Sequence, residues 1–170
     1  QSGSKELYLM NADGGGLRQL TQDKKVCIGP RWGPENRLIT YTGYLQGFPD
    51  VYQVELATGK RSVLSRESGL NTGAVISPDG RKVALILSRD GNPELYVKEL
   101  RSGQLTRLTR TQRAAEASPC WSPDGREIAY VSDSPGAPHI YILSSSGGRP
   151  RRLSSQGSEN VAPDWGPNGL

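Results

Sequence analysis

The sequence predicts an all-β fold, a β-propeller of four-stranded antiparallel blades of about 44 residues each, present as a partial ring of three full blades and two partial ones. A tight-turn signal that contains proline recurs along the chain at steps of 44, 45 and 44 residues. A tyrosine in an apolar segment recurs at steps of 44, 44 and 45 residues. The turns lie at residues 33–36, 77–80, 122–125 and 166–169, and the tyrosines are Tyr8, Tyr52, Tyr96 and Tyr141. Two landmarks that keep one register indicate an internal repeat.

Each period consists of four short strands joined by turns. In the copy at residues 66–109, the first strand ends at Ile76, before a turn in which proline presets φ, aspartate bonds its own backbone and glycine closes the reversal. The second strand, at residues 83–86, is apolar throughout. After a polar loop, the third strand contains Tyr96, and a glycine turn at residues 101–104 leads into the fourth. Residues 1–21 are predicted as the last two strands of a blade, residues 22–65, 66–109 and 110–154 as complete blades, and residues 155–170 as the first strand of another.

This pattern favours a propeller because a blade can bury both of its faces only against neighbouring blades. A second strand that is apolar throughout fits a strand covered on both faces. The large residues that end the first strands are predicted to pack between blades rather than to bind ligands by stacking, and the tyrosines are predicted as core. Arginines on the fourth strands are predicted to protect an outer edge from pairing with another chain. The large residues are Trp32, Trp121 and Trp165, and the arginines are Arg18, Arg61, Arg107 and Arg151.

Composition and charge argue against several classes of function. The formal charge of +4 comes from 21 basic and 17 acidic residues, and no basic block is longer than Arg151-Arg152, which argues against nucleic-acid binding. The longest apolar run, near residues 83–87, is far shorter than the roughly 20 residues of a membrane-spanning helix, so we expect no direct membrane insertion. Cys27 and Cys120 show no metal-binding spacing, and we expect two free thiols rather than a disulfide. Residues 1–7 lack the features of a secretory signal, which indicates a mature form or an excised piece.

The sequence has no recognisable catalytic apparatus. The single histidine, His139, begins a predicted third strand beside a polar loop, and we expect it to face solvent. Neither a Gly-x-Ser-x-Gly nucleophile elbow nor a Walker-type glycine loop is present. Asp79 and Asp124 each belong to a repeat turn, one blade apart, which argues against a catalytic pair. We therefore expect no enzyme and no cofactor, with a Ca²⁺ ion held by loop oxygens in the channel as the open alternative.

Three stretches of the chain resemble the TolB propeller family of Gram-negative bacteria. The resemblance covers essentially the whole chain, and it depends most on an Asn-Ala-Asp-Gly run followed by a Ser-Arg-Asp-Gly-Asn-Pro loop, since the blade turns alone are shared with other propellers. It implies a six-bladed propeller preceded by a small α/β domain, of which this chain covers a part. The stretches are residues 7–14, residues 77–80 with 87–97, and residues 121–125 with 128–133.

The resemblance also implies a function and a site. TolB proteins are periplasmic components of the Tol-Pal cell-envelope system, and they dock the peptidoglycan-associated lipoprotein Pal over one mouth of the channel. The loops that contact the partner lead into first strands. Asn71 matches the family's pattern, whereas Leu70 stands where a histidine is common, and Gly73 and Ala117 are small. The matching residues of this chain are Leu70, Asn71, Thr72, Gly73, Glu116, Ala117 and Ser118.

These features lead to three hypotheses. The first is a non-catalytic, protein-binding scaffold that docks a Pal-type lipoprotein and other Tol components, with roles in envelope integrity, cell division and protein import. The second is the gating propeller of a prolyl-oligopeptidase-type serine peptidase, separated from its hydrolase domain. The third is a propeller segment that self-associates, because open blade faces expose apolar surface.

Overall fold

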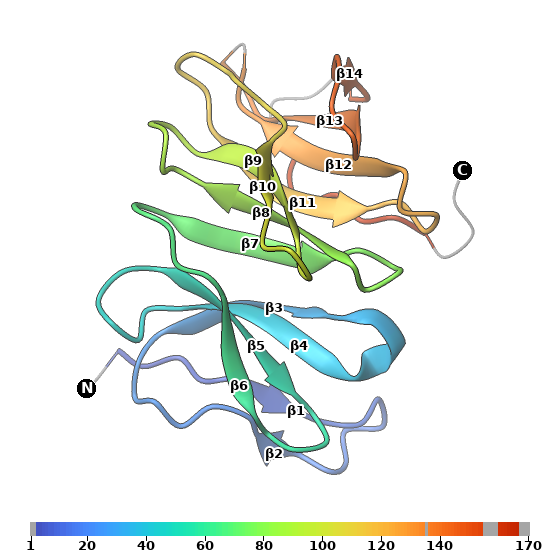
Figure 1. The fold of residues 1–170 in the computed structure, drawn as a ribbon. Helices are drawn as coiled ribbons and strands as arrows, with labels where there is room; N and C mark the ends of the chain where they lie inside the picture. Colours follow the sequence, from blue (N-terminus) through green and yellow to red (C-terminus); the bar gives the residue numbers. More distant parts are fainter. Residues whose placement is uncertain (1–2, 135, 155–159, 167–170) are drawn as a thin grey trace.

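The computed structural model describes residues 3–134, 136–154 and 160–166. These residues form one two-stranded and three four-stranded antiparallel sheets, which follow one another in chain order (Figure 1). Among them lies a single helical element, the 3-10 turn η1 (Pro34–Asn36). The predicted all-β fold of four-stranded antiparallel blades is therefore confirmed. The strands are β1 (Tyr8–Leu9), β2 (Arg18–Gln19), β3 (Cys27–Trp32), β4 (Leu38–Gly43), β5 (Asp50–Glu55), β6 (Arg61–Ser65), β7 (Asn71–Ile76), β8 (Lys82–Leu87), β9 (Glu94–Glu99), β10 (Leu105–Arg107), β11 (Glu116–Trp121), β12 (Glu127–Ser132), β13 (His139–Ser144) and β14 (Arg151–Arg152).

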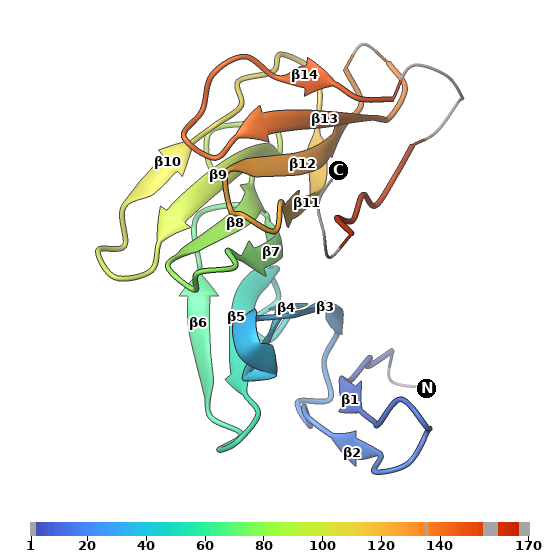
Figure 2. The ribbon, with the colours of Figure 1, turned by 90° about the vertical axis from the view of Figure 1, so that its right-hand side faces the viewer.

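Each four-stranded sheet is a meander in which strands that are consecutive in the chain are neighbours in the sheet. We call the first strands, β3, β7 and β11, the inner strands. They carry the contacts between successive sheets: β7 contacts β3, β4 and β5, and β11 contacts β7, β8 and β9. Figure 2 shows the fourth strands β6 and β10 on the outer side of this stack, away from the inner strands.

The last predicted blade lies partly outside the described residues. Of residues 155–170, the structure describes 160–166, and these contain no strand. The fourth predicted turn, at residues 166–169, lies outside the described residues after Gly166. Among the residues that the structure does describe, no helix is long and apolar enough to cross a membrane.

The proline turns contain the hydrogen bonds that their sequence predicts. Ser77 Oγ donates to Asp79 Oδ1 at 2.6 Å, and the Arg81 N–H donates to the same oxygen at 3.0 Å. The Ser77 bond, followed by the Arg81 bond, lowers the pKa of Asp79 below its ordinary value. The turn at residues 122–125 repeats these bonds around Asp124. Both aspartates therefore serve turns, as predicted.

Strand β8 shows how one strand serves two blades. Val83, Leu85 and Leu87 pack in a cluster shared with the preceding blade. Ala84 and Ile86 pack in a cluster shared with the following blade. Successive side chains of a strand point to opposite faces, so a strand that is covered on both faces must be apolar throughout. The prediction for the second strand is confirmed.

The tryptophans at the ends of the inner strands have different environments. Trp121 is buried, and its Nε1–H donates to the Val75 carbonyl of the preceding blade at 2.8 Å, which confirms the predicted packing between blades. Trp165 is half-buried against the cluster that contains Cys120. Trp32 is 53% exposed, so the prediction is wrong there. The reason is that the neighbouring β1–β2 sheet, among the described residues, has no inner strand to cover the ring.

The tyrosines are core residues in the complete blades but not in the two-stranded sheet. Tyr52 and Tyr96 are buried, and Tyr141 is half-buried. The Tyr96 hydroxyl donates to Asp90 at 2.6 Å, and burial together with this bond raises the pKa of Tyr96 to about 12. Tyr8 is 58% exposed because β1 pairs with β2 alone, so the prediction that it lies in the core is wrong.

The four arginines predicted to protect the outer edges do not share one register. Strand pairing places Arg18 and Arg151 at equivalent positions, whereas Arg61 lies one residue earlier and Arg107 one residue later. A shift of one residue turns a side chain to the other face of the sheet. Arg107 pairs with the buried Glu94, so this arginine does more than protect an edge.

Both cysteines are buried and free, as predicted. Burial raises the pKa of Cys120 to about 11, and it also raises the pKa of Cys27 above the ordinary value. Because the thiolate is the nucleophile and the metal ligand, a thiol that stays protonated at neutral pH is unreactive. Cys27 and Cys120 therefore act as small core residues.

Candidate binding site on the inner strands

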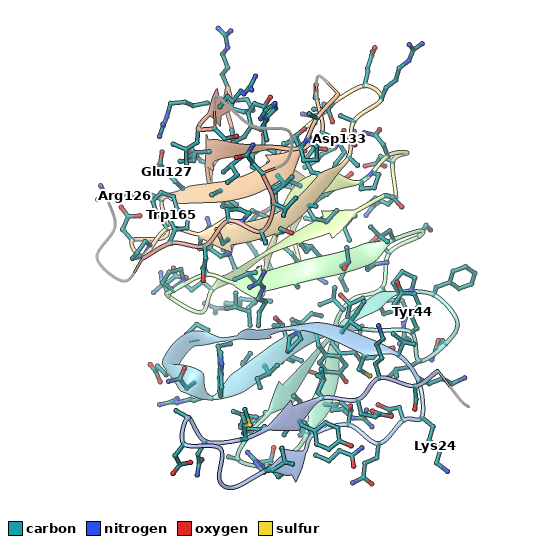
Figure 3. All side chains as sticks on the ribbon, turned by 180° about the vertical axis from the view of Figure 1, so that it is seen from behind. Lys24, Tyr44, Arg126, Glu127, Asp133 and Trp165 are labelled. Carbon is teal, nitrogen blue, oxygen red and sulfur yellow. The ribbon has the colours of Figure 1, made fainter. Side chains whose placement is uncertain are left out.

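The loops before the inner strands and the loops between second and third strands gather at one end of the molecule, which we call the loop end. Figure 3 labels Lys24, Tyr44 and Asp133 along this end, and Arg126 and Glu127 along the opposite one. At the loop end, the first N–H of the inner strands β7 and β11, and the equivalent N–H of Asn160, donate to a proline carbonyl of the preceding blade, whereas the first N–H of β3 donates to the Lys5 carbonyl. The bonds to proline join Asn71 to Pro49 at 3.2 Å, Glu116 to Pro93 at 2.9 Å, and Asn160 to Pro138 at 3.0 Å.

A cavity of about 320 Å³ lies among the inner strands β3, β7 and β11. It brings together the two segments that the sequence analysis identified as a partner-contacting surface. Ile86 and Pro119 add apolar surface to its lining, and Arg31 adds a guanidinium group. The cavity therefore offers a carboxyl group, hydroxyl groups, a cation and apolar side chains to a ligand. Six of the seven predicted residues line it: Leu70, Thr72, Gly73, Glu116, Ala117 and Ser118.

Each inner strand has a β-bulge at this cavity. The pairing register shifts in β3, β7 and β11, around Gly29, Gly73 and Ser118, whose φ angles are +62°, +64° and +50°. Left-handed backbone is easy for glycine but costs another residue about 1 kcal/mol. Ser118 therefore holds a strained conformation on the cavity wall, and binding sites are where proteins commonly retain such strain.

Asn71, the seventh predicted residue, does not line the cavity. Its side chain is buried, and Oδ1 accepts hydrogen bonds from Ser65 Oγ at 2.9 Å and from the Glu67 N–H at 2.8 Å. Nδ2 donates to the carbonyls of Glu67 and Gly69 at 2.7 and 3.1 Å. These four bonds occupy the whole amide. Asn71 thus fixes the loop that presents Leu70 to the cavity.

Glu116 lines the cavity, although only 2% of its surface is exposed. The Thr111 hydroxyl lies 3.0 and 3.1 Å from its two carboxyl oxygens, and Ser132 Oγ donates to Oε1 at 3.1 Å. The same Thr111 hydroxyl is 3.4 Å from Oε1 of Glu94, which pairs with Arg107 at 2.9 Å. Burial first, and the neighbouring Glu94 second, raise the pKa of Glu116 to about 7. A carboxyl group that titrates near neutral pH therefore borders the cavity.

The position that Glu94 occupies was missed in the sequence analysis. It is the first residue of the third strand, and Asp50 and His139 occupy it in the neighbouring blades. The prediction that His139 faces solvent is wrong, because this residue is 7% exposed and contacts the guanidinium of Arg152 at 2.9 Å. The outer strand β14 covers the imidazole at this point. A signal was available in the preceding prolines, which recur as Pro49, Pro93 and Pro138.

One group of side chains among the described residues has the spacing of a metal site. The ligand atoms of Glu6, Asp23 and Cys27 lie within 4.8 Å of one another. These groups already have partners, since Arg61 pairs with Asp23 and the Thr21 hydroxyl donates to Glu6. The carboxyl groups of this cluster therefore hold residues 6 and 21 together and connect Asp23 with strand β6.

Comparisons with known proteins agree with this architecture. The family described as the TolB beta propeller domain matches residues 1–170. The Tol-Pal system protein TolB of Desulfosudis oleivorans is 34% identical over 109 residues, which are 64% of this chain and 25% of that protein. The crystal structure of TolB from Acinetobacter baumannii is 29% identical with a TM-score of 0.86, over 96% of this chain and 41% of the other. A putative TolB from Agrobacterium tumefaciens is 26% identical with a TM-score of 0.82, over 98% of this chain and 64% of the other.

This chain spans less than two thirds of the length of each of these three relatives. All three are named as TolB proteins rather than peptidases. The alternative hypothesis from the sequence, the gating propeller of a serine peptidase, is therefore not favoured.

Proposed function

Because the chain belongs to the TolB β-propeller domain family, we propose that it is a non-catalytic scaffold that binds proteins of the Tol-Pal system in the periplasm. Its principal partner is a Pal-type lipoprotein, which docks on the cavity among the inner strands, and other Tol components are further partners. The relative from Desulfosudis oleivorans, which carries the name of this system, supports the assignment.

One observation carries the choice of surface. The cavity joins Leu70, Thr72 and Gly73 with residues 116–118, which are far apart in the sequence, on a single concave surface. Both segments belong to strands that pack against neighbouring blades. A partner therefore meets a surface that is already formed, and little conformational entropy is lost when it binds.

The rest of the loop end also suits a protein partner. A second hollow of about 390 Å³ lies between residues 46–50 and 66–69, next in sequence to Leu70. Phe48 lines this hollow and is 74% exposed. Exposed aromatic side chains beside a hollow are typical anchors of protein interfaces. A partner centred on the cavity can therefore extend over Phe48.

The proposal is tested by isothermal titration calorimetry of this chain with the soluble domain of a Pal-type lipoprotein. Two variants change the cavity wall: Leu70→Asp places a charge on its apolar part, and Ala117→Arg fills it with a long cation. Gln104→Arg is the matched control, because it adds the same cation at an exposed turn at the opposite end. We expect each cavity variant to weaken binding at least about tenfold, which corresponds to about 1.4 kcal/mol.

We expect Gln104→Arg to bind the lipoprotein domain with the same affinity as the wild type, since the length of the strands separates the two ends of the molecule. Equal affinity of all four proteins would exclude the cavity as the docking surface. No heat from the wild-type chain, with its far-UV circular dichroism and monomeric light scattering intact, would exclude the partner. Light scattering also tests self-association, the third hypothesis from the sequence.

A further inference from the structure

Two buried carboxyl groups, those of Glu94 and Glu116, lie close together at the loop end and share the Thr111 hydroxyl as a hydrogen-bond donor. Glu94 is fully buried, and all of its donors converge on Oε1: the Arg107 guanidinium at 2.9 Å, the Thr111 N–H at 2.7 Å, the Thr111 hydroxyl at 3.4 Å and Asn92 Nδ2 at 3.3 Å. Oε2 of Glu94 is buried and has no hydrogen-bond partner among the described residues. A buried oxygen without a donor is costly, and the cost is largest when the group is ionised.

The charges around this pair do not balance when both groups are ionised. Arg107 is the one cation that contacts the pair among the described residues, since Arg31 borders the same cavity but forms no ion pair with Glu116. Asp133, in the loop after β12, raises the pKa of Glu116 further, and Asp90 lies 3.8 Å from Arg107. Burial first, and the negative charge of Glu116 second, raise the pKa of Tyr130. Two carboxylates beside one guanidinium leave one negative charge without a counterion in the protein interior.

We propose that Glu116 keeps its proton up to neutral pH and that the loss of this proton as the pH rises further is a conformational switch at the cavity. With the proton bound, the pair carries one negative charge, which Arg107 neutralises, and residues 110–115 keep their hydrogen bonds to the pair. When the proton leaves above neutral pH, repulsion between Glu94 and Glu116 loosens this segment, which leads directly into Glu116 on the cavity wall.

The equivalent position in the preceding blade shows what a neutral group achieves there. Asn71 begins β7 as Glu116 begins β11, and its amide both donates and accepts hydrogen bonds to the loop before it. A protonated carboxyl group also donates and accepts, whereas a carboxylate only accepts. Loss of the proton from Glu116 therefore removes a hydrogen-bond donor at the position where Asn71 of the preceding blade donates through Nδ2.

The segment that the switch controls is attached to the pair directly. The Thr111 N–H and hydroxyl both contact the carboxyl groups, and the Ala115 N–H donates to Asp133 at 2.7 Å. Asn92 connects Glu94 to the carbonyls of Thr111 and Ala114. A change in the charge of the pair is therefore transmitted to both ends of residues 110–115.

The sign of the pH dependence follows from the raised pKa. An ordinary glutamate in the unfolded chain has a pKa near 4.5, whereas burial and Glu94 raise the pKa of Glu116 to about 7 in the folded protein. The folded state thus retains the proton that the unfolded state has lost. The stability contributed by this group is fully present below the unfolded pKa and is lost as pH rises through about 7.

The experiment compares the free wild-type protein with Glu116→Gln, which keeps the shape and the donor of the protonated acid, and with Glu127→Gln as a matched control in the same blade. Carboxyl carbons of ¹³C-labelled glutamate are titrated by NMR, and thermal unfolding is measured across the same pH range. We expect one wild-type carboxyl to titrate near pH 7 and to be absent from Glu116→Gln only. At alkaline pH we expect Glu116→Gln to melt on the order of 5 °C above wild type, with no difference at acidic pH.

Amide exchange of Thr111 and Ala115, corrected for the pH dependence of intrinsic exchange, reports on the segment itself. We expect its protection to fall in the wild type above neutral pH and to persist in Glu116→Gln. A wild-type protein in which every glutamate titrates near the ordinary value would overturn the proposal, and so would a melting difference that does not change with pH. None of these measurements involves a partner, so the result stands apart from the proposed docking function.

Discussion

Two junctions between blades occupy the same place in the repeat and use different chemistry. At the Asn71 junction, a neutral amide satisfies the preceding loop with four hydrogen bonds. At the Glu116 junction, the same position holds an acid beside a second buried acid, Glu94, and one guanidinium from Arg107. The backbone is the same in both, since the first N–H of the inner strand donates to the proline carbonyl of the preceding blade.

The comparison shows that the repeat requires certain backbone hydrogen bonds and apolar contacts, whereas the side chains at the junctions can vary. Backbone bonds and apolar packing recur because each blade must cover its neighbour. The side chains that begin the third strands of the three complete blades are all polar, but their chemical groups differ: they are Asp50, Glu94 and His139. The junction next to the cavity can therefore acquire a property, here a dependence on pH, without any change in the fold.

The largest expected effect comes from removing the cation of the Glu116 junction. Arg107→Met leaves the buried carboxyl group of Glu94 without its cationic partner, and we expect a loss of about 3 kcal/mol in the free energy of unfolding, measured by urea denaturation at pH 7. Arg66→Met is the counterpart at the Asn71 junction, where the exposed Arg66 pairs with the buried Asp50. Its effect should be smaller, because Asp50 also accepts a hydrogen bond from the Tyr52 hydroxyl, whereas Oε2 of Glu94 has no donor among the described residues. Equal losses in the two variants would show that the junctions do not differ in the way described.

A smaller effect is expected from removing the amide of the Asn71 junction. Asn71→Ala leaves the N–H and carbonyl of Glu67 and the Gly69 carbonyl without their partner, and we expect a loss of about 2 kcal/mol in the free energy of unfolding. The difference in stability between Asn71→Ala and wild type should not vary between pH 5 and pH 8, because an amide does not titrate. The difference between Glu116→Gln and wild type, in contrast, should depend on pH. A loss that grows with pH would contradict the role of the neutral Asn71 amide described for this junction.

The smallest effects are expected at the bulges beside the junctions. Gly73→Ala places a Cβ at a φ of +64° and 3.3 Å from Pro119 Cδ, and should lower the free energy of unfolding by about 1 kcal/mol. Ser118→Gly relieves the strain at the equivalent bulge but makes the unfolded chain more flexible, so the net change should stay within about 0.5 kcal/mol. If Ser118→Gly destabilised the protein as much as Gly73→Ala, the strain at Ser118 would not exist.

The fold was predictable because a repeat multiplies weak local signals. Each proline turn is a modest indication of a hairpin, but turns and tyrosines that keep the same period leave few architectures. The same reasoning misjudged Trp32 and Tyr8, since a repeat position predicts burial only where the adjoining blade is present to cover it. It also misjudged His139, because an adjacent polar loop does not reveal that the outer strand β14 folds back over the imidazole.

The clustering of the candidate residues was predictable, whereas their chemistry was not, and their role in partner binding stays a prediction. The resemblance to TolB identified Leu70, Ala117 and their neighbours, and the structure brings all but Asn71 to one cavity. Glu94 and its contact with Thr111 were missed, because a carboxyl group at the start of a strand looks like any exposed acid in a sequence. Its burial depends on Arg107, which reaches it from a different strand, and on the meeting of two blades.

The most direct test of the docking surface is a hydrogen–deuterium exchange footprint of this chain with and without the soluble domain of a Pal-type lipoprotein. We expect slower exchange at residues 69–73 and 116–118, at the loop end, and unchanged exchange at the turns 79–81 and 124–126 at the opposite end. Protection confined to those turns, or to the outer strands, would contradict the assignment of the inner-strand cavity as the surface that binds the partner.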